Sequence, residues 1–231
     1  MCENGNITIR YANNNDKKDI LEFLLSDFLI NEALNASCGL SRGEAEEFFS
    51  QLIDIGLGGE ESCIILNEKN EIIGCKLGCI MNRNDEVEEV NLMNQEILNN
   101  DGTRKIVTKS SYSNVEHIKA ILSHVDSKLW DSIPKNINKI MSVIIISVSK
   151  ENTRKGYGKQ LITYGINKLK ENNVQGIVAE CSAIKSQNLF GKLGFTCQYL
   201  ILHKEFVDEN NHQIFIAKDE TDSVKIMFKE I

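Results

Sequence analysis

The fold of this chain is decided by residues 144–159, which have the sequence IIISVSKENTRKGYGK. The first half belongs to an apolar segment, 139–148, whose β-branched residues occupy both faces, a pattern typical of a central strand covered by helices on both sides. The second half holds Gly156 and Gly158, directly before an amphipathic helical pattern that runs to Lys170. The stretch therefore predicts a buried strand, a short glycine loop and a helix.

A strand, a glycine loop and a helix in this order are suited to binding a phosphate group. Glycines let the backbone approach a ligand closely, and the free N–H groups of the first helical turn attract an anion. Lys155 and Arg154 add positive charge beside the loop. Two other phosphate motifs fit poorly, because Leu161 holds the third glycine position of G-x-G-x-x-G and no P-loop ending is present. A bare G-x-G at this place is equally compatible with a simple turn.

The remaining segments predict an α/β fold with a mixed sheet. Strands are expected over 6–11, 62–66, 71–81, 139–148, 176–181, 196–206 and 222–231, and helices from a cap at 13–16 to 31–35 and over 42–57, 156–170 and 186–193. Residues 84–137 form a long, mostly polar insert before the core strand, with an acidic patch at Asp85, Glu86, Glu88 and Glu89. A helical pattern through 115–125 predicts helices that pack over a site. No repeat or Pro/Gly linker indicates a boundary, so we expect one domain over 1–231.

Composition and charge argue against several classes of function. The chain has 231 residues, 42% hydrophobic and 26% charged, which is typical of a globular domain. A net charge of -7 with no Lys/Arg run longer than a pair argues against a nucleic acid or an anionic membrane as partner. The N-terminus predicts neither a signal peptide nor a membrane span, so a cytoplasmic protein is expected. The seven cysteines and four histidines have no metal-ligand spacing, and neither disulfides nor a metal site are expected.

A second segment, 181–195, follows the next predicted strand and has the sequence CSAIKSQNLFGKLGF. A strand, an R/Q-x-x-G-x-G loop, a helix, a strand and a short helix ending in Leu-Gly-Phe form the core of the GNAT acetyltransferase superfamily, which this chain resembles. Within that superfamily it is similar, over nearly its whole length, to the insect and invertebrate arylalkylamine (dopamine) N-acetyltransferases.

Four features carry the closer resemblance. Residues 31–35 are Asn-Glu-Ala-Leu-Asn, similar to the family's Asp-Glu-Pro-Leu-Asn. The Cys-Ser-x-x-x-Ser spacing from Cys181 to Ser186 precedes Lys-Leu-Gly-Phe as in the family. The insert lies just before the core strand, and the tail over 211–231 looks like the family's closing hairpin.

The resemblance implies a GNAT fold, with a mixed, mostly antiparallel twisted sheet of about seven strands flanked by helices and splayed at its central parallel pair, here about 140–148 and 176–181. Acetyl-CoA is then the co-substrate, with its pyrophosphate on the glycine loop and its pantetheine between the splayed strands. The backbone N–H of Val148 is expected to polarise the thioester oxygen. The implied co-substrate-binding residues are Ile146, Ser147, Val148, Thr153, Arg154, Lys155, Gly156, Tyr157, Gly158, Lys159, Ser186 and Asn188.

By the same resemblance Glu32 is the base that takes a proton from the amine, directly or through water, with Ser182 and Ser186 orienting water, amine or leaving thiolate. Each residue also has a plainer interpretation. Glu32 is one of 33 acidic residues, most of which belong on a solvated surface. Ser182 and Ser186 lie where a strand passes into a helix, and serine is a preferred helix cap.

The implied activity is direct acetyl transfer in a ternary complex to the primary amine of a small arylalkylamine, such as dopamine, octopamine, serotonin, tyramine or tryptamine. Trp130 and Tyr112 are candidate walls of the aromatic pocket, although core packing is the commoner role of such residues. Another acceptor, such as a polyamine, an amino acid or a protein N-terminus, stays open, as does an acyl-CoA-binding module of low activity. A monomer is expected.

Three residues depart from the family pattern. Thr153 stands where Arg or Gln is usual, so one phosphate contact is displaced to Arg154 or lost. Phe190 replaces a tyrosine that protonates the thiolate in many members, which excludes phenol acid catalysis there. Ala33 replaces the proline after the base, which loosens the loop but leaves the carboxylate in place.

Overall fold

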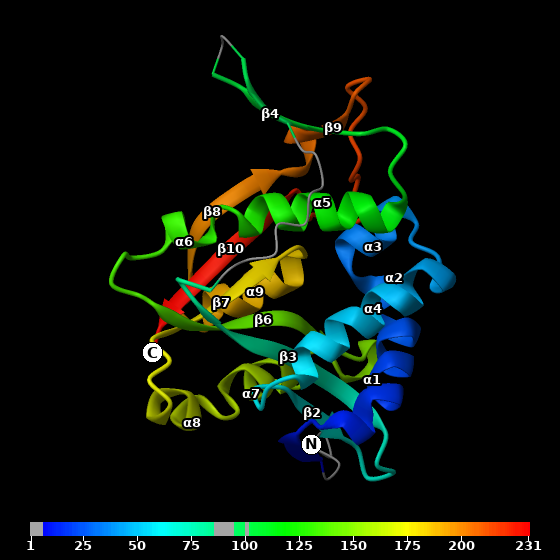
Figure 1. Ribbon diagram of the computed structural model, residues 1–231. Helices are drawn as coiled ribbons and strands as arrows, with labels where there is room; N and C mark the ends of the chain where they lie inside the picture. Colours follow the sequence, from blue (N-terminus) through cyan, green and yellow to red (C-terminus); the bar gives the residue numbers. More distant parts are fainter. Residues whose placement is uncertain (1–6, 86–94, 100–101) are drawn as a thin grey trace.

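The computed structural model describes residues 7–85, 95–99 and 102–231. Its main sheet has seven strands in the order β1-β2-β3-β6-β7-β10-β8, and a second sheet has three in the order β4-β5-β9 (Figure 1). The strands are β1 (Thr8–Tyr11), β2 (Cys63–Leu66), β3 (Ile72–Asn82), β4 (Gln95–Leu98), β5 (Arg104–Thr108), β6 (Lys139–Val148), β7 (Gly176–Cys181), β8 (Thr196–Leu202), β9 (Phe206–Asp208) and β10 (Ser223–Glu230).

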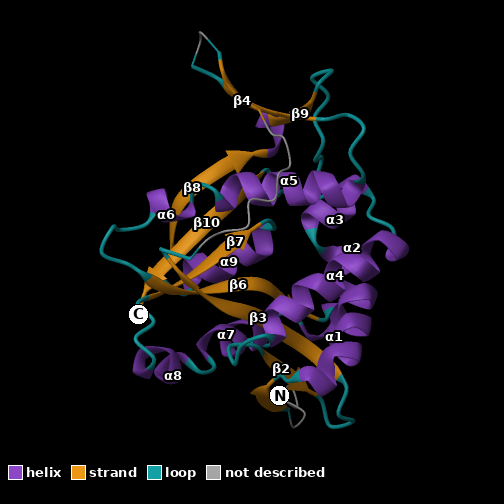
Figure 2. Cartoon of the chain, viewed as in Figure 1, coloured by secondary structure: helices purple, strands orange, loops and turns teal. Residues whose placement is uncertain are grey.

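The helices occur mainly before β2, between β5 and β6, and after β6 and β7 (Figure 2). They are α1 (Lys17–Phe23), the π-helical η2 (Leu24–Phe28), α2 (Leu29–Asn31), α3 (Ala33–Cys38), α4 (Arg42–Leu57), α5 (Asn114–Asp126), α6 (Leu129–Ser132), α7 (Tyr157–Thr163), α8 (Ile166–Glu171) and α9 (Ile184–Lys192). Short 3-10 turns are η1 (Asn14–Asp16), η3 (Lys150–Asn152) and η4 (His203–Glu205). No helix within the described residues has both the length and the apolar character that a membrane crossing requires.

The main sheet is mixed and mostly antiparallel, as the sequence predicts. Strands β6 and β7 form its parallel pair, and the other neighbouring strands run antiparallel. The predicted fold class is confirmed, because the sheet has seven strands, with this parallel pair at its centre and helices on its flanks. The small sheet, in which β5 runs parallel to β9, was not expected.

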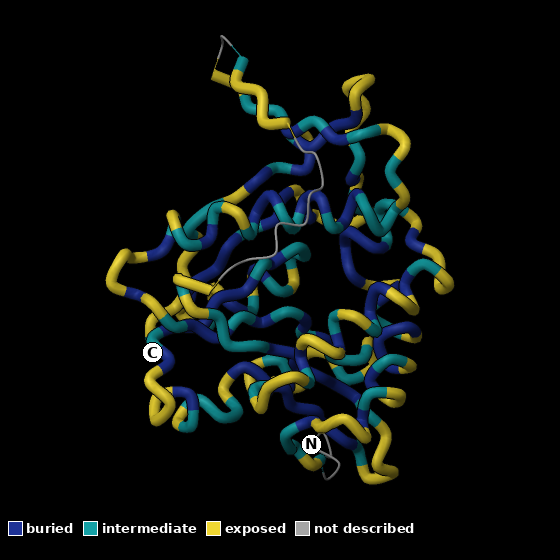
Figure 3. The backbone as a smooth tube through the Cα atoms, in the orientation of Figure 1, coloured by how far each residue is buried: buried dark blue, intermediate teal, exposed yellow. Residues whose placement is uncertain are grey.

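Helices cover both faces of the main sheet. On one face α1, α4 and α5 supply Ile20, Phe49 and Ile121 to the largest apolar cluster, all fully buried. On the other face α7 and α9 bring Ile162 and Phe190 against the strands. The inner strands β2, β3, β6, β7 and β10 are accordingly mostly buried, along the centre of the molecule (Figure 3). Both faces of β6 are thus covered, which explains its nearly continuous apolar sequence.

The structure corrects three expectations about elements. The 84–137 insert is not only helical, because β4 and β5 precede its helices. Its acidic patch lies largely outside the described residues. The predicted helix over 156–170 is two helices, since Tyr164 is extended and Gly165 is left-handed, with φ 80°. The tail is not a hairpin: β10 pairs with β7 and β8, and 211–222 is mostly loop.

Candidate active site

Strands β6 and β7 separate toward their carboxyl ends. They pair only as far as Val143 and Ala179, although β6 continues to Val148 and β7 to Cys181. On its other edge β6 stays paired with β3 to its last residue. The β7-facing edge of residues 144–148 therefore has no strand partner, which is the predicted splay.

The backbone N–H groups of Ile146 and Val148 face this gap. Ser149 donates its N–H to the carbonyl of Ile73 in β3, at 2.9 Å. Hydrogen-bonded and non-bonded positions alternate along an antiparallel pair, so the N–H groups of Val148 and Ile146 point the opposite way, toward β7. Ser147 is bound to the β3 side and its side chain is buried. Two of the three predicted β6 residues thus present free donors in the gap.

The glycine loop follows directly. Gly156 is left-handed, with φ 81°, and precedes the first turn of α7, while Arg154 is also left-handed at φ 64°. A Cβ on Gly156 would meet nothing within 4 Å, so its glycine character serves the backbone conformation. At Gly158 a Cβ would lie 2.9 Å from the Leu189 side chain of α9, so this glycine allows two helices to approach.

The side chains of the loop are held by local hydrogen bonds. The Thr153 hydroxyl donates to the carbonyl of Lys150 at 2.9 Å, and the Lys155 ammonium donates to the side-chain oxygen of Asn152 at 2.8 Å. Arg154, Lys155 and Lys159 are exposed. Tyr157, by contrast, is buried in the core beside β2, which leaves only its backbone for a ligand. Exposed positive charge therefore surrounds the start of α7.

Glu32 and Ser182 meet at the end of β7. The Ser182 hydroxyl donates to Oε1 of Glu32 at 2.8 Å, across 150 residues of sequence. Oε2 of Glu32 accepts the backbone N–H of Asn35 at 2.8 Å, because Glu32 caps the N-terminus of α3. Glu32 is 8% exposed. Hydrogen bonds thus hold both oxygens of the carboxylate in place.

Burial sets the protonation behaviour of Glu32. Desolvation is the largest influence and raises the pKa of its carboxyl above the usual value. Hydrogen bonds from the backbone of 33–35 and from Ser182 lower the pKa and partly offset this effect. The interpretation of Glu32 as one more solvated surface acid is therefore wrong.

Ser186 lies apart from this pair. Its hydroxyl donates to the carbonyl of Ala183 at 2.7 Å, in the first turn of α9. Ser182 does not cap α9 either, because the hydroxyl of Thr221 accepts the N–H of Ile184 at 2.9 Å. Asn188 is exposed on α9. Thr221 follows a loop and lies 37 residues from Ile184 in sequence, so no local sequence pattern predicts that it caps α9.

Three aromatic residues singled out in the sequence belong to packed regions. Phe190 is fully buried and contacts Phe195 edge to face, with ring centroids 4.8 Å apart. The guanidinium of Arg83 lies 4.8 Å from the ring centre of Trp130. Tyr112 lies beside His117, with ring centroids 5.9 Å apart. Core and surface packing thus account for the contacts of these rings.

Sequence reasoning missed two groups near the site. Asp27 accepts the backbone N–H of Lys150 at 2.9 Å. Glu180 in β7 hydrogen-bonds Asp126 of α5, and burial is the main cause that raises the pKa of both carboxyls. Glu180 could have been found from the sequence, because it is a charged residue within the otherwise apolar segment 176–181. No such signal marks Asp27.

Among the described residues, no three His, Cys, Asp or Glu side chains are grouped as metal ligands. The arrangement instead combines a free strand edge, a positively charged glycine loop and a buried carboxylate bonded to a serine. These parts converge at the carboxyl ends of β6 and β7. Such a site can hold an extended acyl carrier and remove a proton beside it.

No protein-family model matches the sequence, and no curated protein sequence matches it. Solved structures do match. Arylalkylamine N-acetyltransferase 2 from Aedes aegypti has a TM-score of 0.81 at 23% identity, covering 98% of this chain and 100% of its own. A Drosophila melanogaster polyamine N-acetyltransferase, which forms N-acetylagmatine, has a TM-score of 0.76 at 14% identity, with 98% and 100% covered.

A GNAT-superfamily phosphinothricin acetyltransferase from Sinorhizobium meliloti, solved with acetyl-CoA, has a TM-score of 0.51 at 15% identity, covering 97% of this chain and 88% of its own. At these identities the likeness is one of fold. The expected resemblance is confirmed at that level: the chain has the fold of the GNAT acetyltransferases and resembles the insect arylalkylamine N-acetyltransferases in structure.

Proposed function

We propose that this protein is an acetyl-CoA-dependent N-acetyltransferase whose acceptor is the primary amine of a small arylalkylamine, such as dopamine, octopamine, serotonin, tyramine or tryptamine. The observation that carries the proposal is the hydrogen bond between Ser182 and the buried Glu32 at the open end of the β6–β7 pair. The fold shared with arylalkylamine and polyamine N-acetyltransferases supports it.

In this proposal acetyl-CoA is a co-substrate held by the chain's own backbone and loop. The pantetheine arm lies along the free edge of 144–148, where the N–H groups of Ile146 and Val148 are available. The pyrophosphate lies at the start of α7, beside Arg154 and Lys155. The N–H of Val148 donates to the thioester oxygen as negative charge develops on it.

The amine then attacks the thioester carbonyl directly, in a ternary complex. An alkylamine is mostly protonated near neutral pH, so its proton must leave before attack. Ser182 accepts this proton as it passes its own to Oε1 of Glu32, along the bond seen in the structure. The raised pKa of Glu32 makes it a better proton acceptor than an ordinary carboxylate. The C–N bond forms, the C–S bond breaks, the nitrogen loses its second proton to the departing thiolate directly or through water, and CoA leaves as the thiol.

A polyamine is the second candidate acceptor, and the Asp126–Glu180 pair favours it. Glu180 precedes Ser182 by two residues, so strand alternation directs both toward the same face. Two hydrogen-bonded carboxyls there supply acceptors for a second ammonium. Turnover of spermidine that falls in Asp126→Asn would favour this acceptor over an arylalkylamine.

The test is CoA release from acetyl-CoA with dopamine, octopamine, serotonin, tryptamine and spermidine in parallel. The wild-type protein is expected to turn over an arylalkylamine fastest. Glu32→Gln should lower kcat by at least about 100-fold, because it removes the proton acceptor and keeps the shape. Glu46→Gln, an exposed acid of α4, is the matched control.

Three outcomes distinguish the hypotheses. Turnover with spermidine alone would replace the arylalkylamine by the polyamine. Tight acetyl-CoA binding without CoA release from any amine would indicate a binding module on the same fold. Full activity of Glu32→Gln would remove Glu32 from the mechanism and leave the activity itself standing.

A further inference from the structure

Residues 27–32 connect the carboxyl ends of the two splayed strands. Oδ2 of Asp27 accepts the N–H of Lys150, two residues after β6, at 2.9 Å. Oε1 of Glu32 accepts the hydroxyl of Ser182, one residue after β7, at 2.8 Å. One short segment is thus bonded to both sides of the gap between β6 and β7.

The backbone of this segment is irregular. Leu24–Phe28 is a π-turn, in which the N–H of Leu29 bonds to the carbonyl of Leu24, one residue further back than in an α-helix. After one further turn of α-helix the chain becomes extended at Glu32, with ψ 139°. The π-turn holds Asp27, and the extended residue is Glu32 itself. Single π-turns inside α-helices occur frequently at functional sites.

On the other side, Lys150 belongs to the glycine loop. Its carbonyl accepts the Thr153 hydroxyl at 2.9 Å and the Thr153 N–H at 3.4 Å. Asn152 accepts the Lys155 ammonium at 2.8 Å, next to Gly156. Hydrogen bonds therefore join Asp27 to Lys150, and tie Lys150 and Asn152 to Thr153 and Lys155 just before α7.

We infer that Asp27 is a positioning residue, which ties the glycine loop to the segment that carries Glu32 and so couples acetyl-CoA binding to the placement of the base. The inference rests on the proposed function. A carboxylate bonded to a backbone N–H is a charge-assisted hydrogen bond, stronger than a neutral one. With the co-substrate on the loop, this bond holds residues 27–32 at a fixed distance from the strand ends.

The test is a set of variants at Asp27 with kinetics in both substrates. Asp27→Ala removes the acceptor and is expected to raise the KM for acetyl-CoA and lower kcat, each about 10-fold. Asp27→Asn keeps an oxygen acceptor for the Lys150 N–H, so its KM for acetyl-CoA and its kcat should both lie close to the wild-type values. Asp19→Ala removes an exposed acid of α1 on the same helical segment and is the matched control.

A double-mutant cycle with Glu32→Gln separates positioning from general stability. If Asp27 acts on kcat through Glu32, Asp27→Ala has little effect on kcat when Glu32 is already Gln, whereas its effect on acetyl-CoA binding persists. Calorimetric titration with acetyl-CoA measures the binding effect without turnover. Thermal melts of each variant confirm that the fold is retained.

The inference is overturned if Asp27→Ala matches Asp19→Ala in KM and kcat, or if its loss of kcat is unchanged in the Glu32→Gln background. It is also overturned if Asp27→Asn is as impaired as Asp27→Ala. Failure of the proposed function looks different, because the wild type itself would then release no CoA with any amine.

Discussion

Glu32 is a buried acid that keeps the capacity to ionise. Desolvation alone would favour the protonated form, but the Asn35 N–H and the Ser182 hydroxyl both stabilise the carboxylate. The opposing influences leave a carboxyl whose pKa is raised, yet whose charged form has defined partners. A general base works best when its pKa approaches the operating pH, so this balance is the property that the proposed reaction needs.

Removing the Ser182 hydroxyl tests that balance. Ser182→Ala takes away a hydrogen bond that lowers the pKa of Glu32, so this pKa rises further. The proposed mechanism uses Glu32 in its deprotonated form, and the acid limb of the kcat/KM profile should therefore move to higher pH. With the proton relay lost, kcat should fall about 10-fold or more. A pH series of CoA release with the preferred amine measures both.

Ser186→Ala provides the comparison, because the Ser186 hydroxyl donates to the Ala183 carbonyl instead of to Glu32. Ser186→Ala should leave the acid limb of the kcat/KM profile at the same pH as in the wild type. An unshifted limb in Ser182→Ala would show that the observed hydrogen bond does not set the ionisation of the base. A catalytic role of Ser186 stays a prediction, separate from this test.

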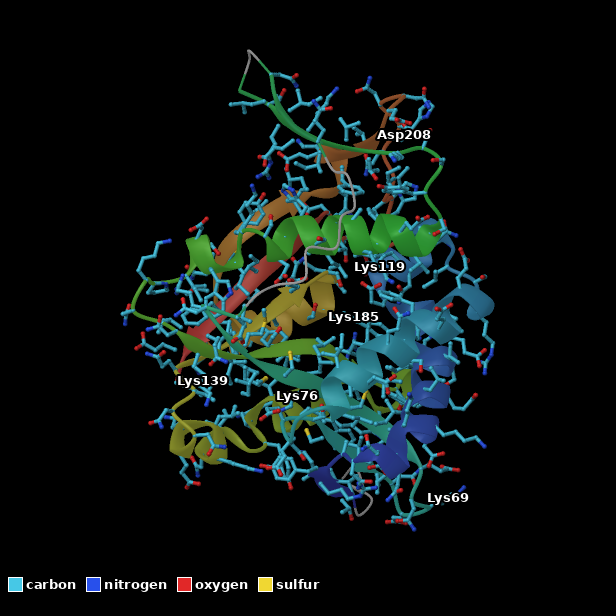
Figure 4. All side chains as sticks on the ribbon, in the orientation of Figure 1. Lys69, Lys76, Lys119, Lys139, Lys185 and Asp208 are labelled. Atoms are coloured by element: carbon cyan, nitrogen blue, oxygen red, sulfur yellow. The ribbon has the colours of Figure 1, made fainter. Side chains whose placement is uncertain are left out.

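Lys76 is the most deeply buried cation among the described residues. It is 1% exposed in the middle of β3, and its ammonium donates only a long bond, 3.4 Å, to the carbonyl of Tyr164 at the end of α7. Figure 4 places it inside the fold, whereas Lys69 lies at the periphery. Burial lowers the pKa of Lys76 from 10.5, since the charged form is poorly solvated there.

Lys76→Met is therefore expected to stabilise the protein, by about 1–3 kcal/mol at neutral pH. The unfolded chain keeps the Lys76 proton up to pH 10.5 and the folded chain loses it earlier, so wild-type stability rises with pH in this range. The difference in stability between Lys76→Met and the wild type should therefore be smaller at high pH than at neutral pH. Urea unfolding at neutral and at high pH, with Lys69→Met as control, measures it. A destabilised variant would mean that the bond to Tyr164 outweighs the burial cost.

At the level of elements, α5 packs against β7, β8 and β10 and carries His124 inward. Nε2 of His124 lies 3.0 Å from the hydroxyl of Tyr199 in β8, and the residue is 8% exposed. Burial, with help from the nearby charge of Lys128, lowers the pKa of His124 from 6.5 to about 4. The helix is therefore packed around a neutral imidazole.

This predicts an acid-sensitive contact between α5 and β8. The unfolded chain binds a proton at His124 as pH falls below 6.5, whereas the folded chain binds it only near pH 4. Stability is therefore lost as pH falls through this window, by at most about 3 kcal/mol. In His124→Gln the decline should be smaller by that amount. Urea unfolding at several pH values compares the two, and parallel curves would assign the decline to other groups.

Local pattern was sufficient for most elements and for half of the site. The apolar sequence of β6, the helix over 42–57 and the glycine loop were visible because each follows from its neighbours in the chain. The break between α7 and α8 at 164–165 was not visible in the sequence, since it depends on contacts with Tyr11 and Lys76 from distant strands. Resemblance supplied Glu32 and Ser182, but only the fold shows that they touch.

At the level of the whole molecule, two sheets share one core. Ile106 of β5 and Phe206 of β9 are fully buried in the same apolar cluster as α4 and α5. The polar link is Arg104 of β5, which donates to the Tyr199 hydroxyl at 2.7 Å and to Glu205 at 2.8 Å. Tyr199 is also the partner of His124. Arg104 therefore connects the small sheet, β8 and α5 in one network.

Arg104→Met should loosen the small sheet without unfolding the molecule, because its apolar contacts remain while about 1–3 kcal/mol of charge-assisted hydrogen bonding is lost. Hydrogen exchange should rise in β5, in β9 and at the carboxyl end of α5, and stay unchanged in β6 and β7, because the side-chain bonds of Arg104 go to Tyr199, Leu200 and Glu205 and not to these strands. Lys105→Met is the control, since its ammonium contacts only the exposed loop residue Asn211. Equal acceleration in both sheets would show that they unfold as one unit, and the small sheet could then not open independently of β6 and β7.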